Sequence, residues 1–356
     1  MGFDVAVIGS GPGGFYCALA RAQAGLRTAL VERDRLRGTG FRWGCLPVKI
    51  MLDSLRRGER WAGRRGASRA RSARSALLAD LRHSLPQIES HLNRRLTAAG
   101  VQIIVGEARL RGPREIEVGE RRLETRAVVL ATGSEPAGWP GVPLGGRTCL
   151  SHRDLLALPR LPRRLLVLGG DVEGIELACL LSRLRVRVTV VEKQPEILPG
   201  QDRDLVAPVE QALRASGVSL LTGCTVSGSR AGPSGLSVEL ADGRRLQAPA
   251  ALLTGLRRPN LPEGLEAAGV RLAPGGATVA VDAALQTSCP DVYAVGDVNG
   301  LSGMAHAAIE QGLRVARTVA GAAGRGAAPP RAYTGLARAL FTLPEIAGAG
   351  LQEREL

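Results

Sequence analysis

The sequence has 356 residues and a formal net charge of +14, and only two of its 47 basic residues, Lys49 and Lys193, are lysines. This length accommodates two domains of roughly 150 residues each. No apolar run approaches the roughly 20 residues of a membrane helix, and no basic leader precedes the first apolar segment. We therefore expect a cytoplasmic protein without membrane association.

The excess of arginine is explained by GC-rich coding, and an aromatic content of 3% is too low for base-stacking platforms, so no nucleic-acid partner is expected. The six cysteines are scattered without a C-x-x-C pair, which argues against a disulfide framework and a zinc site, and no metal is expected. Five of them are expected in the core, namely Cys17, Cys149, Cys179, Cys224 and Cys289.

The first motif is a glycine-rich turn between an expected strand (3–8) and an expected helix (15–24). The next apolar strand (28–31) ends in Glu32. A G-x-G-x-x-G turn lets a pyrophosphate approach the helix N-terminus, and the acid can bond ribose hydroxyls. The motif predicts a dinucleotide site that includes Gly9, Ser10, Gly11, Pro12, Gly13, Gly14, Glu32 and Arg33.

The same pattern recurs later in the chain, with a strand at 164–168, a helix at 175–184 and a strand at 186–191. The acid follows the first glycine at the same spacing in both copies. Two further strands, 127–130 and 250–253, each precede a Thr-Gly turn. The repeat predicts a second dinucleotide site containing Gly169, Gly170, Asp171, Gly174, Glu192 and Gly255, in which Asp171 replaces the middle glycine.

Residues 38–49 form the stretch on which the chemistry depends. Cys45 lies four residues before Lys49 and enters a helix behind Pro47, so both side chains share one helical face. A helix N-terminus favours a thiolate. Cys45 and Lys49 are therefore candidate catalytic residues.

This stretch resembles the redox signature of the pyridine nucleotide-disulfide oxidoreductases, the family of dihydrolipoamide dehydrogenase and mercuric reductase, whose pattern is G-G-T-C-x-x-x-G-C-x-P-S-K. Gly40 stands at the first cysteine and Val48 at the serine. The matching residues are Thr39, Gly44, Cys45, Pro47 and Lys49. Residues 291–297, Ala305-His306 and 341–347 resemble later motifs of the family.

The resemblance implies bound FAD. Asp297 would bond the ribityl hydroxyls, Ala305 and His306 would offer backbone amides, and Lys49 would pair with Glu176 beside flavin N5. The cofactor-binding residues implied by the resemblance are Gly38, Thr39, Lys49, Ala131, Thr132, Gly133, Ser134, Gly296, Asp297, Ala305 and His306.

Three departures bear on activity. Gly40 removes the thiol that attacks a disulfide, Asp171 places a carboxylate where a pyrophosphate approaches, and the family's C-terminal interface domain is absent. We expect an FAD-dependent oxidoreductase without a redox-active disulfide, acting by hydride transfer at flavin N5. The alternatives are an NADH-dependent flavin reductase or oxidase using oxygen, a quinone or a metal ion, and a non-catalytic FAD-binding scaffold or truncated family member.

The expected fold is α/β, with two Rossmann-like three-layer domains, the FAD domain being interrupted by an inserted NAD(P)-binding-like domain. The expected bounds are 1–145 and 276–325 for the FAD domain, 146–275 for the inserted domain, and 326–356 for a stub of the interface domain. Two helices joined near 63–68 should span 50–99. The substrate is expected to be small or carrier-bound, and the protein to be a monomer or atypical dimer. The arginine-rich run 56–74 is expected to be a solvated face, and the alternative is a docking surface for an acidic carrier.

Overall fold

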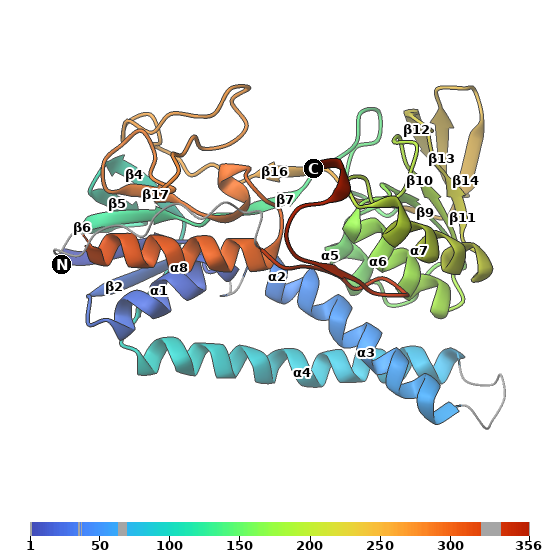
Figure 1. Cartoon of the computed structure of the whole chain (residues 1–356), viewed down its shortest axis with the longest axis horizontal. Helices are drawn as coiled ribbons and strands as arrows, with labels where there is room; N and C mark the ends of the chain where they lie inside the picture. Colours follow the sequence, from blue (N-terminus) through green and yellow to red (C-terminus); the bar gives the residue numbers. More distant parts are fainter. Residues whose placement is uncertain (1, 35, 37, 63–69, 322–335, 356) are drawn as a thin grey trace. The chain divides into compact units, whose positions relative to one another are not determined.

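The computed structural model describes residues 2–34, 36, 38–62, 70–321 and 336–355. The chain forms two compact units (Figure 1). Unit 1 consists of residues 1–45, 85–135 and 258–333, and unit 2 of residues 46–84, 136–257 and 334–356. None of the described helices is long and apolar enough to cross a bilayer.

Unit 1 is built on a seven-stranded sheet in the order β3-β2-β1-β6-β5-β4, with β17 also paired to β6. The strands β1, β2, β3, β6 and β17 run parallel, and β4, β5 and the first half of β6 are antiparallel. The bounds are β1 Gly2–Ile8, β2 Thr28–Glu32, β3 Gln102–Val105, β4 Ala108–Gly112, β5 Glu115–Val118, β6 Arg121–Leu130 and β17 Val292–Ala294.

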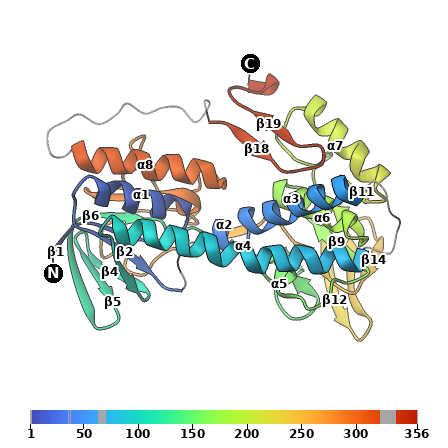
Figure 2. The ribbon, with the colours of Figure 1, turned by 90° about the horizontal axis from the view of Figure 1, so that it is seen from below.

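Apolar clusters cover both faces of this sheet. Along β1, Val5 and Val7 point into one cluster, and Ala6 and Ile8 into the other, as the period of two in a strand requires. The helices α1 and α8 lie side by side on one face (Figures 1 and 2). A side chain at Gly312 would overlap the carbonyl oxygen of Gly13, so these helices pack backbone to backbone. The bounds are α1 Pro12–Gln23 and α8 Ala305–Gly321.

Unit 2 contains a five-stranded parallel sheet in the order β11-β10-β9-β15-β8 and a three-stranded antiparallel sheet, β12-β13-β14. The strands of the parallel sheet are β8 Cys149–Leu150, β9 Arg164–Leu168, β10 Arg187–Val191, β11 Ser219–Leu221 and β15 Ala251–Leu253. The remaining bounds are β12 Val226–Gly232, β13 Gly235–Leu240, β14 Arg245–Ala248, α5 His152–Ala157, α6 Val172–Arg183 and α7 Arg203–Ala215.

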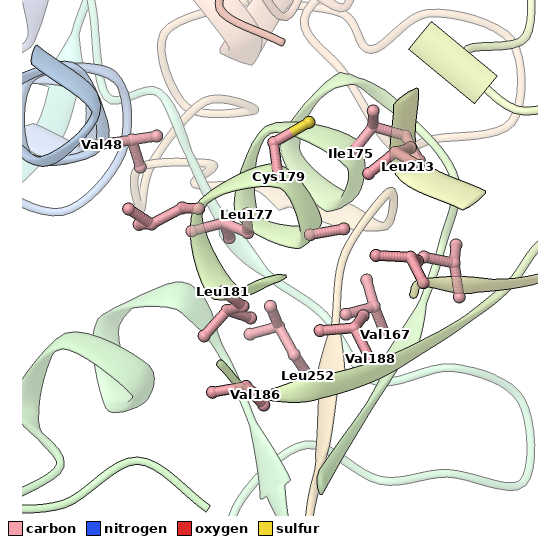
Figure 3. Packing of buried hydrophobic residues seen from close by; sticks show 14 of the residues in the cluster. Val48, Val167, Ile175, Leu177, Cys179, Leu181, Val186, Val188, Leu213 and Leu252 are labelled. Atoms are coloured by element: carbon pink, nitrogen blue, oxygen red, sulfur yellow. The ribbon is translucent and has the colours of Figure 1, made fainter. Parts of the chain in front are cut away.

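A helix from the signature region belongs to the core of unit 2. Val48 and Leu52 of α3 are buried in the same cluster as Ile175 and Cys179 of α6 (Figure 3). Since α3 is amphipathic, its apolar face needs a partner, and α6 and the neighbouring sheet provide one. The bounds are α2 Gly38–Arg42, α3 Cys45–Ala62 and α4 Ala70–Ala98, with the expected junction at 63–68 outside the described residues.

A hairpin of β18 (Arg338–Leu340) and β19 (Ile346–Gly348) also belongs to unit 2. The packing units therefore differ from the domains expected from the sequence. Residues 46–84 and 334–356 pack with unit 2 because their apolar side chains are buried there. The functional domain bounds stay predictions. Most side chains of the run 56–74 lie outside the described part of the chain.

Candidate functional site

The first glycine turn leaves β1 and enters α1. Gly9 has a φ of +100°, which favours glycine, and a side chain at Gly14 would overlap the carbonyl oxygen of Gly9. Gly11 differs, because its backbone is extended and a Cβ there would meet nothing within 4 Å. The turn therefore packs tightly on the protein side and leaves open space at the helix N-terminus, as a bound pyrophosphate requires.

Glu32 is fixed against this turn. Its Oε2 accepts hydrogen bonds from the Ser10 amide at 3.0 Å and the Ser10 hydroxyl at 2.6 Å, and its Oε1 accepts one from the Asp34 amide at 3.1 Å. The carboxylate thus stands at the end of β2 with its orientation set and lone pairs left for ribose hydroxyls. The side chain of Arg33 is instead exposed and pairs with Glu107 at 3.8 Å.

The later motifs of unit 1 converge by hydrogen bonding. The Ser134 hydroxyl donates to Asp297, and the Ser134 carbonyl accepts from the Thr39 hydroxyl at 3.4 Å. The Gly296 amide donates to Gln311 of α8 at 2.6 Å. Segments that follow β6, β17 and the signature turn therefore meet in one network, and these residues fit a flavin nucleotide.

The signature turn α2 packs against the first glycine turn. A Cβ at Gly40 would lie 3.2 Å from Pro12 Cγ and 3.8 Å from Ala305 Cβ, so a cysteine here needs a shift of only a few tenths of an ångström. Cys45 begins α3 and is half-buried, whereas the other five cysteines are buried, which confirms the expectation that they are core residues. Burial raises the pKa of Cys17 to about 12 and that of Cys179 to about 11, which makes these thiols unreactive.

The second turn repeats the first in unit 2. Gly169 has a φ of +118°, and a side chain at Gly174 would overlap the Gly169 carbonyl oxygen. Glu192 accepts a hydrogen bond from the Gly170 amide at 2.6 Å, as Glu32 does from Ser10. The strand, turn and acid therefore have the same local geometry in both copies.

Asp171 occupies the place of Gly11 without changing the backbone. Its φ and ψ are −71° and −178°, against −59° and 177° at Gly11. Its carboxylate caps α6 by accepting a hydrogen bond from the Gly174 amide at 3.1 Å. Burial first, and then the charge of Glu173, raise the pKa of Asp171 to about 6 against the opposing hydrogen bonds. The sequence signal for this cap is an aspartate directly before a helix.

Sequence reasoning missed the neighbours of this turn. His152 is buried, with its Nδ1 against Oε1 of Glu173. Arg257 Nη1 approaches the other Glu173 oxygen at 4.0 Å. Burial raises the pKa of Glu173, but His152 and Arg257 outweigh it and lower the pKa overall. No pattern in the sequence links these three positions.

Lys49 and Glu176 lie together in unit 2. Glu176 is buried, which raises its pKa, whereas a hydrogen bond from the Phe341 amide and the charge of Lys49 act in the opposite direction. Lys49 Nζ lies 4.1 Å from the centroid of the Phe341 ring. The expected pair is thus close enough for electrostatic coupling, and the hairpin adds a third member.

The predicted site residues fall into two groups. The residues of the first group lie after strands of unit 1. The residues of the second group lie after strands of unit 2, and Lys49 and Glu176 belong to this second group. Among the described residues, no group of three or more side chains could hold a metal ion. The group in unit 1 comprises Gly9, Ser10, Gly11, Pro12, Gly13, Gly14, Glu32, Gly38, Thr39, Ala131, Thr132, Gly133, Ser134, Gly296, Asp297, Ala305 and His306.

The fold and the first turn define a flavin nucleotide oxidoreductase with two Rossmann-like units. The family described as "Pyridine nucleotide-disulphide oxidoreductase" matches residues 3–312. The chain belongs to this family and is an FAD-dependent oxidoreductase, which confirms the family, the fold class and the enzyme class expected from the sequence. The family uses FAD, which the sequence predicted, and NAD(H), which the sequence predicted only as an alternative because of Asp171.

Known proteins similar to this chain are consistent with this family assignment. The chain is 36% identical to a dihydrolipoyl dehydrogenase of Thermus scotoductus over 99% of its own length and 77% of the relative's, and 35% identical to one of Pseudomonas aeruginosa over 98% and 76%. The crystal structure of LpdA from Mycobacterium tuberculosis matches with a TM-score of 0.86 and 28% identity, over 99% of this chain and 79% of that one.

Proposed function

We propose that this flavoprotein transfers hydride at flavin N5 without a redox-active disulfide. The observation that carries the proposal is Gly40, which leaves the signature turn without the thiol that would attack a disulfide substrate. The flavin supplies the redox chemistry when it is bound. This chain's residues bind and orient it: Gly11 leaves room for the pyrophosphate, Glu32 bonds the ribose and Asp297 the ribityl hydroxyls.

Lys49, Glu176 and Cys45 are the proposed catalytic residues. Lys49 and Glu176 form a coupled charge pair in unit 2, and in this proposal they adjust the electrostatics at the reacting end of the flavin. Cys45 begins α3, where the helix N-terminus favours a thiolate that can donate electron density. The single thiol acts through charge, since Gly40 stands where the family motif has the second thiol.

The electron donor in this proposal is the substrate itself, which is small or carrier-bound. Asp171 supports this. Its carboxylate accepts the hydrogen bond of the Gly174 amide at the start of α6, and it places negative charge where a dinucleotide phosphate would bind. The expected cytoplasmic location and the expected monomer or atypical dimer remain part of the proposal.

A second candidate keeps the nicotinamide nucleotide. Its support is the local geometry at Gly169, Gly174 and Glu192, which repeats that of Gly9, Gly14 and Glu32 in the first turn. The protein would then be an NADH-dependent flavin reductase or oxidase that passes electrons to oxygen, a quinone or a metal ion. Glu192 would favour NADH over NADPH because a carboxylate repels the additional phosphate.

Spectroscopy of the purified protein tests these proposals. We expect a flavin spectrum, slow bleaching by anaerobic NADH and no turnover of lipoamide, glutathione or mercuric ion. Gly40→Cys should restore a thiol pair with Cys45, detected as the loss of two titratable thiols on oxidation. A protein that takes up no FAD refutes the proposal, as does disulfide reduction by the unmodified chain at rates typical of the family. A flavoprotein without turnover on any donor would be the expected scaffold instead.

A further inference from the structure

Lys49 and Glu176 share a third neighbour, Phe341, which belongs to the hairpin of β18 and β19. The Phe341 amide donates a hydrogen bond to Glu176 Oε1 at 2.8 Å. The ring of the same residue faces Lys49 Nζ at 4.1 Å from its centroid. One residue of the C-terminal hairpin therefore contacts both members of the charge pair, the acid through its backbone and the base through its ring.

The hairpin that carries Phe341 is firmly anchored in unit 2. Leu340 and Ile346 pair across it and are buried in the cluster that also holds Val48 of α3. Glu345 pairs with Arg56 of α3 at 2.6 Å. The hairpin and the helix that carries Lys49 are therefore joined both by this ion pair and by the shared apolar cluster. Phe341 lies between these anchors.

The surroundings of Glu176 favour its neutral form, whereas its contacts with Phe341 and Lys49 favour the carboxylate. Glu176 is only 8% exposed, and burial together with the charges of Glu173 and Asp171 favours its neutral form. The Phe341 amide and the Lys49 ammonium favour the carboxylate. The negative face of the Phe341 ring attracts the Lys49 ammonium and thereby holds that side chain in place.

We propose that Phe341 is a positioning residue that holds the Lys49 ammonium beside the Glu176 carboxylate. The hairpin thus completes the charge pair. This inference rests on the proposed function only for its consequence at the flavin. The contacts of the three residues lie within unit 2 and can be tested without turnover.

The lysine content of the chain provides the test. Lys49 and Lys193 are the only lysines, and Lys193 is exposed, so it serves as an internal standard. The purified flavoprotein is acetylated with limiting acetic anhydride, and the ratio of modification at the two lysines is read by mass spectrometry. Phe341→Leu should raise the relative rate at Lys49 by about threefold to tenfold, because the ring no longer stabilises and shields the ammonium. Phe341→Tyr should stay within about twofold of the unmodified protein.

Two further variants separate positioning from simple packing. Leu343→Ala removes a neighbouring apolar side chain of the hairpin that packs on the same core, and it should leave the labelling ratio unchanged. Glu176→Gln combined with Phe341→Leu should give a non-additive effect on Lys49, because both substitutions act on one ammonium. The inference is overturned if Phe341→Leu leaves the ratio unchanged, if Leu343→Ala reproduces its effect, or if the double substitution is additive.

A flavin readout connects this inference to the proposed function. Phe341→Leu should shift the flavin midpoint potential, and Leu343→Ala should not. A shift absent from both variants, with the labelling effect present, refutes the action of the pair on the flavin and leaves the role of Phe341 established. A chain without flavin refutes the proposed function, and the labelling ratio then still decides whether Phe341 holds Lys49.

Discussion

The two glycine turns share a backbone and differ in what the helix behind each of them can bind. Gly11 and Asp171 have nearly the same φ and ψ, and the first and last glycines of each turn are equally tight. At Gly11 the space before α1 is open, whereas at Asp171 a carboxylate bonds the Gly174 amide. The side chain of Asp171 therefore caps its own helix, whereas Gly11 leaves the N-terminus of α1 open.

The largest expected effect comes from copying the second turn into the first. Gly11→Asp should lower FAD affinity by about 100-fold, within the roughly 1 to 4 kcal/mol expected for a carboxylate against a dianion near a protein surface. Since a Cβ at Gly11 meets nothing within 4 Å, the apoprotein should fold normally. FAD titration by fluorescence and the melting temperature of the apoprotein measure the two effects. Unchanged FAD affinity would mean that the open space is not the phosphate site.

The next effect concerns pH. The pKa of Asp171 is raised to about 6 in the folded chain from 3.8, so the unfolded chain loses this proton first as pH rises. The free energy of unfolding should therefore fall between about pH 4 and pH 6, by at most about 3 kcal/mol, and stay lower above that range. Asp171→Asn keeps a capping oxygen without the charge, so its advantage over the unmodified protein should grow across this range. Urea denaturation at several pH values measures the free energy of unfolding of both proteins. If the two free energies change with pH in parallel, the raised pKa of Asp171 is contradicted.

The smallest effect concerns the network in unit 1. Ser134→Ala removes the hydroxyl that donates to Asp297, and FAD affinity should fall by about fivefold, which corresponds to one hydrogen bond of about 1 kcal/mol. Thr254→Val serves as the control in unit 2, where the hydroxyl donates to the Leu168 and Gly169 carbonyl groups at 3.2 Å. FAD titration should show no change for the control. An equal loss in both variants would indicate general destabilisation.

Local chemistry explains what could be predicted from the sequence. A turn such as 9–14 needs glycine at fixed positions, and the acid at Glu32 or Glu192 follows a short apolar strand, so each motif is contained within a few residues. The strand at 164–168 has the bounds expected from its apolar run. The helix expected at 175–184 begins earlier, at Val172, because Asp171 caps it.

Contacts between distant segments leave no such pattern. The ring of Phe341 faces Lys49, and His152 contacts Glu173, yet neither pair shares a periodicity or a spacing rule. The placement of α3 in unit 2 likewise depends on α6, which lies more than a hundred residues further along the chain. Such contacts are set by tertiary packing, which residue pattern alone does not specify.

Stopped-flow reduction of the flavin by NADH tests the difference between the turns most directly. We predict slow reduction of the unmodified protein and a rate at least about tenfold higher for Asp171→Gly, which corresponds to roughly 1.4 kcal/mol of relieved repulsion. Asp171→Asn should lie between them because it removes the charge and keeps the bulk. Fast reduction of the unmodified protein by micromolar NADH, with no change on substitution, would show that Asp171 does not obstruct the second turn, and the NADH-driven enzyme would replace the substrate-driven one.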